Sequence, residues 1–220
     1  MSKLAVIFDL DGTLLNTLDD LCDAVNHLLN NHGYPSVSKM KVRRYLGNGA
    51  AELVRCALPE KVNDDIFERY LNEYKEYYAA HSNIKTKPYD GVLELLKDLK
   101  ARGIAVAVVS NKPDAAVKIL CHEYFGDLVC FALGDRPNIE RKPSAAPVHF
   151  AMKSIGCRRA VFVGDSEVDV MTAANAGLPC ISLTWGFRDR EILEEYGALH
   201  FADDADQLNR LISELLSAGE

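Results

Sequence analysis

The sequence lacks three features that would have placed it in a specialised class of protein. No stretch approaches the ~20 apolar residues of a membrane-spanning helix, so no membrane partner is expected. The net charge is −7 and no block of lysine and arginine stands out, which argues against nucleic acid as the main partner. The six cysteines are scattered without a Cys-x-x-Cys pair, so we expect buried free thiols.

Size and composition allow a folded chain with a sizeable core. The 220 residues fit one large domain or one domain with an insertion, and 48% of them are apolar. Met1, Ser2 and Lys3 lead directly into an apolar segment, which leaves no room for a signal peptide. We therefore expect a protein of the reducing cytoplasm.

The segment at residues 4–14 carries the strongest signal. A run of five apolar residues predicts a strand that is buried on both faces, and it ends at Asp9 and Asp11. Ligands bind beyond the carboxyl ends of parallel strands. Two carboxylates this close require a proton or a cation between them. The alternatives are a solvated turn, or an EF-hand loop, for which the further spaced acids are missing.

Residues 16–82 predict an all-helical insertion. Apolar residues recur at helical spacing in four segments, at about residues 18–29, 39–45, 53–58 and 66–78. No strand signal interrupts them.

From residue 87 onward, buried strands alternate with helices. Strands are predicted at residues 104–109, 128–133, 160–163, 180–184 and 198–201, with helices between and after them. This alternation indicates βαβ units and a parallel sheet. The predicted fold is a doubly wound, Rossmann-like α/β core with an inserted helical domain. The core comprises residues 1–15 and 83–220.

Three further polar signals follow predicted strands. Ser110 and Asn111 offer donors for a phosphate at a helix N-terminus, although the same residues are ordinary in a turn. Lys142 precedes a proline and supplies a positive charge, or is simply a surface lysine. Asp165 and Asp169 follow another strand, where metal binding at the sheet edge is favoured over half an EF-hand.

In this order, the four signals resemble the motifs of the haloacid dehalogenase-like phosphatases. The resemblance covers essentially the whole chain, and the helical insertion stands where that family carries its cap. Within the insertion, the turn at Gly47, Asn48 and Gly49 resembles the substrate loop of phosphoglycolate phosphatases. The alternative is that these glycines only allow the chain to turn between two helices. Asn16 is a departure, because relatives often have Asp there.

The resemblance implies a role for each residue. Asp9 is the nucleophile that forms an aspartyl-phosphate, and Asp11 is the general acid and base. The cofactor is Mg²⁺, held by Asp9, Asp165 and the backbone carbonyl of Asp11. Asp169 holds a metal-bound water. Lys142 is a further catalytic residue, because it would stabilise the charge on the transferring phosphoryl group together with Ser110 and Asn111. The expected phosphate-binding and substrate-binding residues are Thr13, Ser110, Asn111, Lys142, Gly47, Asn48 and Gly49.

The sequence therefore predicts a Mg²⁺-dependent phosphatase of small phosphate esters, with 2-phosphoglycolate as the leading substrate and a monomer or homodimer as the assembly. Enzymes that share the fold remain alternatives: a sugar-phosphate phosphatase, a pyrophosphatase or a β-phosphoglucomutase. A dehalogenase is disfavoured, because its chemistry uses no metal and needs no acid at Asp11. A non-catalytic phosphate-binding regulator is the alternative from another class.

Overall fold

The computed structural model describes residues 3–59 and 61–218. The chain forms two compact units, one ending at Leu15 and resuming at Pro88, the other spanning Asn16–Lys87. The predicted boundary after residue 82 falls just beyond the last helix of the insertion, and residues 83–87 belong with the helical unit. Within the described ranges, every helix is too short or too polar to cross a membrane.

The α/β unit is built on a six-stranded sheet in the order β5-β4-β1-β6-β7-β8. All five strand pairings are parallel. This confirms the predicted doubly wound fold, with β1 and β6 at the centre of the sheet. The strands are β1 (Lys3–Phe8), β4 (Ala105–Pro113), β5 (Phe131–Asp135), β6 (Cys157–Gly164), β7 (Cys180–Leu183) and β8 (His200–Ala202).

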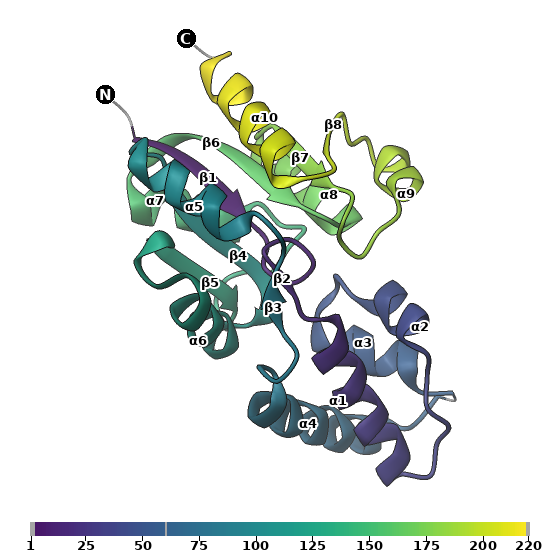
Figure 1. Ribbon diagram of the computed structural model, residues 1–220. Coiled ribbons are helices and arrows are strands. Elements are labelled where there is room, and N and C mark those ends of the chain that lie inside the picture. Colours follow the sequence, from purple (N-terminus) through teal and green to yellow (C-terminus); the bar gives the residue numbers. More distant parts are fainter. Residues whose placement is uncertain (1–2, 60, 219–220) are drawn as a thin grey trace. The chain divides into compact units, whose positions relative to one another are not determined.

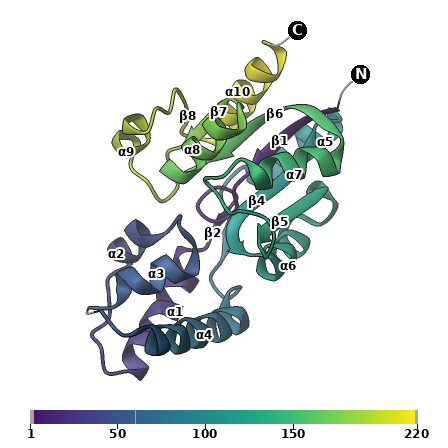
Figure 2. The same cartoon turned by 180° about the vertical axis from the view of Figure 1, so that it is seen from behind.

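Strand β1 is apolar throughout because both of its faces are covered. Val6 and Phe8 pack in one core cluster, and Ala5 and Ile7 in another on the opposite face. Helices α5 (Val92–Ala101), α6 (Asp114–Phe125) and α10 (Ala205–Ser217) supply the first cluster. Helices α7 (Ala146–Ile155) and α8 (Glu167–Ala176) supply the second. Figure 1 shows α5 and α10 in front of the sheet, and Figure 2, turned by 180°, shows α7 and α8 on the opposite face.

Three of the differences between the structure and the predicted elements have a clear physical reason. Strand β4 continues to Pro113, beyond the predicted end at residue 109, because Pro113 still pairs with Asp135 across an irregular register. Strand β5 begins three residues late, since a 3-10 turn (Gly126–Leu128) precedes it. Helix α9 (Arg190–Glu195) was not predicted. Its six residues are too few to show a helical period, although Leu193 is fully buried.

The inserted unit is helical, as its apolar spacing predicts. It contains α1 (Leu18–Asn31), α2 (Lys39–Tyr45), α3 (Gly49–Ala57) and α4 (Asp64–His81). Ser38 and Asn63 cap α2 and α4 by accepting a hydrogen bond from a backbone N–H in the first turn. The chain enters and leaves this unit through two short strands, β2 (Leu15–Asn16) and β3 (Lys87–Pro88), which pair with each other.

Asp20 ties the start of the helical unit to its end. Its buried carboxylate accepts hydrogen bonds from the backbone N–H groups of Ile84, Lys85 and Thr86, at 2.9 to 3.2 Å. The Thr86 hydroxyl is a fourth donor, at 2.7 Å. A buried carboxylate with this many donors fixes the segment after α4 against the first turns of α1.

Candidate active site at the carboxyl edge of the sheet

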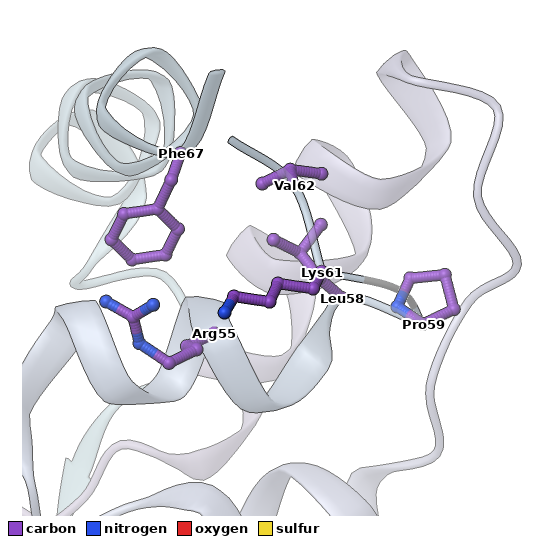
Figure 3. A pocket seen from close by; sticks show the side chains of 6 residues that line it. All are labelled: Arg55, Leu58, Pro59, Lys61, Val62 and Phe67. Atoms are coloured by element: carbon purple, nitrogen blue, oxygen red, sulfur yellow. The ribbon is translucent and has the colours of Figure 1, made fainter. Parts of the chain in front are cut away.

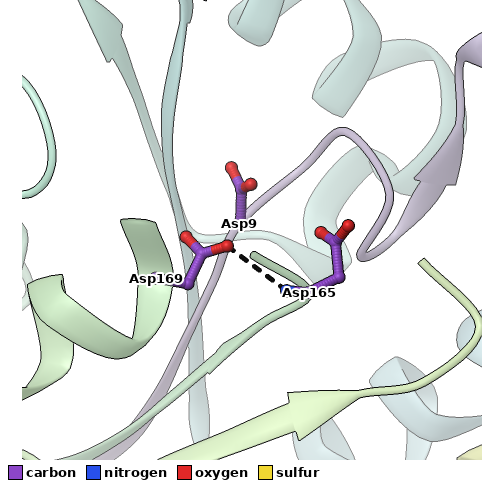
Figure 4. A group of neighbouring side chains, drawn as sticks. All are labelled: Asp9, Asp165 and Asp169. Atoms are coloured by element: carbon purple, nitrogen blue, oxygen red, sulfur yellow. Dashed lines mark hydrogen bonds between the residues drawn. The ribbon is translucent and has the colours of Figure 1, made fainter. Parts of the chain in front are cut away.

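Three aspartates meet beyond the carboxyl ends of β1 and β6. Asp9 follows β1, Asp165 follows β6, and Asp169 lies in the first turn of α8. One carboxylate oxygen from each lies within 4.8 Å of the others, and all three residues are buried (Figure 4). Because the strands are parallel and adjacent, their ends bring together acids that are 156 residues apart in sequence, as Asp9 and Asp165 are.

Burial makes the negative charge of this cluster unfavourable. Desolvation raises the pKa of Asp9 from 3.8 to about 7, against the attraction of Lys142 and with repulsion from Asp169 and Asp11. Desolvation and repulsion from Asp169 and Asp9 raise the pKa of Asp165 well above its usual value. A cation between these groups would remove the repulsion. The donors are all carboxylate oxygens, the ligands that Mg²⁺ prefers, so the residues present fit that ion.

Lys142 is the buried cation of the cluster. Its Nζ lies 2.9 Å from Asp9 Oδ1 and 2.7 Å from Asp169 Oδ1. Burial lowers the pKa of Lys142, but the attraction of Asp169 and Asp9 outweighs it and raises that pKa overall. The Asn111 amide donates to the backbone carbonyl of Lys142 at 3.0 Å. The predicted phosphate-binding amide thus also holds the segment that carries the lysine.

Asp169 is fixed by its place at the start of α8. Its Oδ2 accepts hydrogen bonds from the backbone N–H groups of Asp165 and Ser166, and from the Ser166 hydroxyl at 2.6 Å. Ser166 and Asp169 form a capping box at this helix start. The approach is so close that a Cβ at Gly164 would lie 2.3 Å from Asp169 Cγ. Asp169 therefore orients the loop that carries Asp165.

Asp165 is oriented from three sides. It accepts hydrogen bonds from the Thr13 hydroxyl and the backbone N–H of Phe187, both at 2.7 Å. A Cβ at Gly12 would lie 2.3 Å from its Oδ2, and one at Gly186 would lie 2.2 Å from its Cβ. Thr13, predicted to bind phosphate, is fully buried and here directs its hydroxyl to Asp165.

The segment after β7 is a part of the site that sequence reasoning missed. Besides Gly186 and Phe187, Trp185 donates from Nε1 to the Thr13 carbonyl at 3.2 Å. Arg188 pairs with Glu167 through Nε at 2.5 Å and holds this segment against the start of α8. The signal was available, because residues 185–188 directly follow a predicted strand and so reach the same edge of the sheet.

Ser110 and Asn111 lie near the end of β4 and are buried, as is Lys112. Lys112 is another residue that sequence reasoning missed. Its Nζ lies 2.9 Å and 3.2 Å from the two carboxylate oxygens of Asp11. The Asp11 side chain thus belongs to this ion pair, and among the described residues the metal-type cluster contains only Asp9, Asp165 and Asp169. Four carboxylates and two lysines leave two negative charges, which one divalent cation would neutralise.

The remaining predicted residues lie in the helical unit. Gly47 and Gly49 have φ values of 108° and 81°, which favour glycine, and Asn48 between them is the N-cap residue of α3. The two glycines therefore do shape the turn between α2 and α3. Whether the turn also binds substrate remains a prediction.

The helical unit also has a pocket of its own, of about 330 Å³. It is lined by Arg55, Leu58, Pro59, Lys61, Val62 and Phe67, and none of these is a predicted site residue. Figure 3 shows the Arg55 guanidinium beside the Phe67 ring, 4.2 Å from its centroid. The contact stacks the cation of Arg55 on an aromatic ring, and the lining residues include no acid and no cysteine or histidine.

Known proteins share both the sequence and the fold. A profile of haloacid dehalogenase-like hydrolases matches residues 6–183. Phosphoglycolate phosphatase 1 of Pseudomonas aeruginosa is 39% identical over 86% of this chain and 73% of its own length. Phosphoglycolate phosphatase of Rhodospirillum rubrum is 34% identical over 91% of this chain and 87% of its own.

Two crystal structures agree with the fold. A protein from Lactobacillus delbrueckii subsp. bulgaricus superposes with a TM-score of 0.90 at 35% identity, covering 96% of this chain and 99% of that one. A predicted phosphoglycolate phosphatase from Haemophilus somnus has a TM-score of 0.86 at 30% identity, covering 94% and 96%. Together with the family match and the three aspartates at the sheet edge, these similarities establish the family. The chain belongs to the haloacid dehalogenase-like hydrolases.

Proposed function

We propose that this protein is a Mg²⁺-dependent phosphatase that hydrolyses a small phosphomonoester through an aspartyl-phosphate on Asp9, with 2-phosphoglycolate as its leading substrate. The observation that carries the proposal is the cluster of Asp9, Asp165 and Asp169 around Lys142 at the carboxyl edge of the sheet. The relatives named phosphoglycolate phosphatase support the same reaction class.

The charges of the site explain why a cation is needed. A carboxylate and a phosphate charge ~4 Å apart repel each other by about 4 kcal/mol at an effective dielectric constant near 20. Mg²⁺, when bound by Asp9 and Asp165 with the Asp11 carbonyl, would supply the charge that offsets this repulsion. It would also keep Asp9 ionised, although burial and the neighbouring charges together raise the pKa of Asp9 to about 7.

The side chains of the site have separate roles in the reaction. Asp9 attacks phosphorus, and the phosphoryl group passes to its carboxylate as the leaving oxygen departs. Asp11 gives that oxygen a proton and later takes one from the attacking water. Lys142, Ser110 and Asn111 stabilise the charge on the phosphoryl oxygens, since all three are buried near the ends of the strands.

The choice of a two-carbon substrate rests on the relatives and on the turn of the helical unit. Gly47 and Gly49 adopt positive φ values and carry no Cβ, so the backbone of the turn can approach a ligand closely, which suits an anionic group such as a carboxylate. A hexose would need several side-chain hydrogen bonds that this turn does not offer.

The test is phosphate release from purified protein with Mg²⁺, compared across 2-phosphoglycolate, hexose phosphates, pyrophosphate and an aryl phosphate. We expect the highest kcat/KM with 2-phosphoglycolate, no turnover in chelator, and none in Asp9→Asn. Asp127→Asn is the matched control, because Asp127 is an exposed aspartate that pairs with Lys100 at the surface. Faster turnover of hexose phosphates would refute the substrate assignment alone. Absence of all turnover, or full activity in Asp9→Asn, would refute the proposed function.

A further inference from the structure

Lys112 is a buried lysine that forms an ion pair with the carboxylate of Asp11. Its side chain is 3% exposed, and its Nζ reaches both oxygens of Asp11, at 2.9 Å and 3.2 Å. A buried ammonium group is unfavourable unless it is paired, so the fold depends on this contact or one like it. The reaction described above requires the Asp11 carboxylate but does not use Lys112.

The backbone around Lys112 is built to bring it there. Val109 pairs with Leu133 and Pro113 with Asp135, so β4 has two more residues than β5 over the same stretch. The extra residues interrupt the regular alternation of side chains between the two faces of the sheet. Ser110, Asn111 and Lys112 are all buried in this irregular segment.

Strand β5 supports this irregular segment from the side. A Cβ at Gly134 would lie 2.5 Å from the Lys112 carbonyl oxygen and from the Asp114 Cα, so glycine is required there. The Gly134 N–H also donates to Asp114 Oδ1 at 2.9 Å. The backbone on both sides of Lys112 is therefore held in place.

Lys142 and Lys112 thus pair with different carboxylates of the site. Lys142 contacts Asp9 and Asp169 in the three-aspartate cluster, whereas Lys112 forms an ion pair with Asp11. Asp11 stands two residues after Asp9, close enough in sequence that a divalent cation would attract its carboxylate as a further ligand. A carboxylate bound to the cation would be unavailable for proton transfer.

We propose that Lys112 is a positioning residue that keeps the Asp11 carboxylate apart from the metal cluster and oriented for proton transfer. This inference rests on the proposed function, because it assigns Asp11 the acid and base role. It predicts that removing Lys112 has two opposite effects. Mg²⁺ binds more tightly as Asp11 joins the cluster, and proton transfer to the leaving group becomes slower.

The experiment compares wild type, Lys112→Met, Asp11→Asn and the double variant. Mg²⁺ affinity is measured by calorimetry, and kcat and KM are measured for an alkyl and an aryl phosphate. In Lys112→Met we expect Mg²⁺ affinity to rise several-fold. We also expect kcat for the alkyl ester to fall about tenfold to 100-fold, with a smaller loss for the aryl ester and KM within about twofold. In the Asp11→Asn background, Lys112→Met should change neither quantity further.

The matched control is Lys100→Met, which removes an exposed lysine that pairs with Asp127 at the surface. It should leave Mg²⁺ affinity and both kcat values unchanged. If circular dichroism shows that Lys112→Met is unfolded, Lys112→Gln gives the same comparison with a polar end group.

Three results would overturn the inference: equal losses of kcat for both esters, unchanged Mg²⁺ affinity in Lys112→Met, or an equal gain of affinity in the Asp11→Asn background. The last would mean that Lys112 acts only by its charge. If wild-type protein turned over no ester, the proposed function would fail, while the calorimetric comparison would still decide whether Lys112 restrains Asp11.

Discussion

Replacing Asp9 by asparagine should stabilise the metal-free protein at neutral and alkaline pH. Asp9 is buried beside Asp165 and Asp169, and desolvation raises its pKa from 3.8 to about 7. A group whose pKa is higher in the folded state favours folding while it is protonated. The contribution of Asp9 to the free energy of unfolding is fully present below pH 3.8 and is lost as the pH rises through about 7.

The size of the effect follows from the difference between these two pKa values. Each unit of difference between the folded and unfolded pKa corresponds to about 1.4 kcal/mol. A rise from 3.8 to about 7 therefore lowers the free energy of unfolding by about 4 kcal/mol at pH 8, where Asp9 is ionised in both states. Asparagine keeps the shape of the side chain and removes the charge, while Lys142 keeps its contact with Asp169. The variant should recover most of that free energy at pH 8 and little of it at pH 4.

The assay is urea unfolding in chelator at pH 4 and pH 8, repeated with excess Mg²⁺. Wild type should be stabilised by the ion, by about 2.7 kcal/mol at a hundred times its dissociation constant, and Asp9→Asn much less. Asp127→Asn serves as the control, since its exposed carboxyl should give no such gain at pH 8. If Asp9→Asn were less stable than wild type in chelator at pH 8, the reasoning about buried charge would be wrong.

Three further predictions concern turnover. Asp165→Ala should raise the Mg²⁺ concentration needed for half-maximal rate, and an unchanged requirement would remove Asp165 from the metal ligands. Asp11→Asn should slow alkyl esters more than aryl esters, by at least about tenfold, because a phenolate leaves without a proton; equal losses would indicate a structural role for the side chain. Gly49→Val should raise KM for 2-phosphoglycolate while sparing an aryl phosphate, since Gly49 has a φ of 81° in the turn; equal effects on both would make the turn purely structural.

The core of the fold was predictable because its strands are apolar and because polar residues of the site directly follow β1 and β6. The run before Asp9 alternates between two buried faces, so its sequence signals a central parallel strand directly. The parallel arrangement in turn implies that Asp9, Asp165 and the end of β4 share one edge. Their proximity follows from topology. The structure brings Asp9 and Asp165 together, and Asn111 near the end of β4 donates to the backbone of Lys142, which contacts Asp9.

What sequence reasoning missed depends on contacts between distant segments. Nothing local to Lys112 indicates that its partner is Asp11, 101 residues earlier, because the pairing requires an irregular register between β4 and β5. Gly186 looks like an ordinary loop glycine until Asp165 is packed against it. The helix at residues 190–195 is too short for periodicity and is held by the burial of Leu193.

The hydrogen bonds that Asp20 accepts from four donors have a consequence for how such a protein can change over evolutionary time. They join the exit of the helical insertion to its entrance, and β2 pairs with β3 at the same crossing. A segment whose two ends are joined by hydrogen bonds can be lengthened, shortened or exchanged without changing the spacing of the strands on either side of it. The closure at Asp20 therefore allows the insertion to change in length or sequence while the strands that carry Asp9 and Asp165 stay as they are.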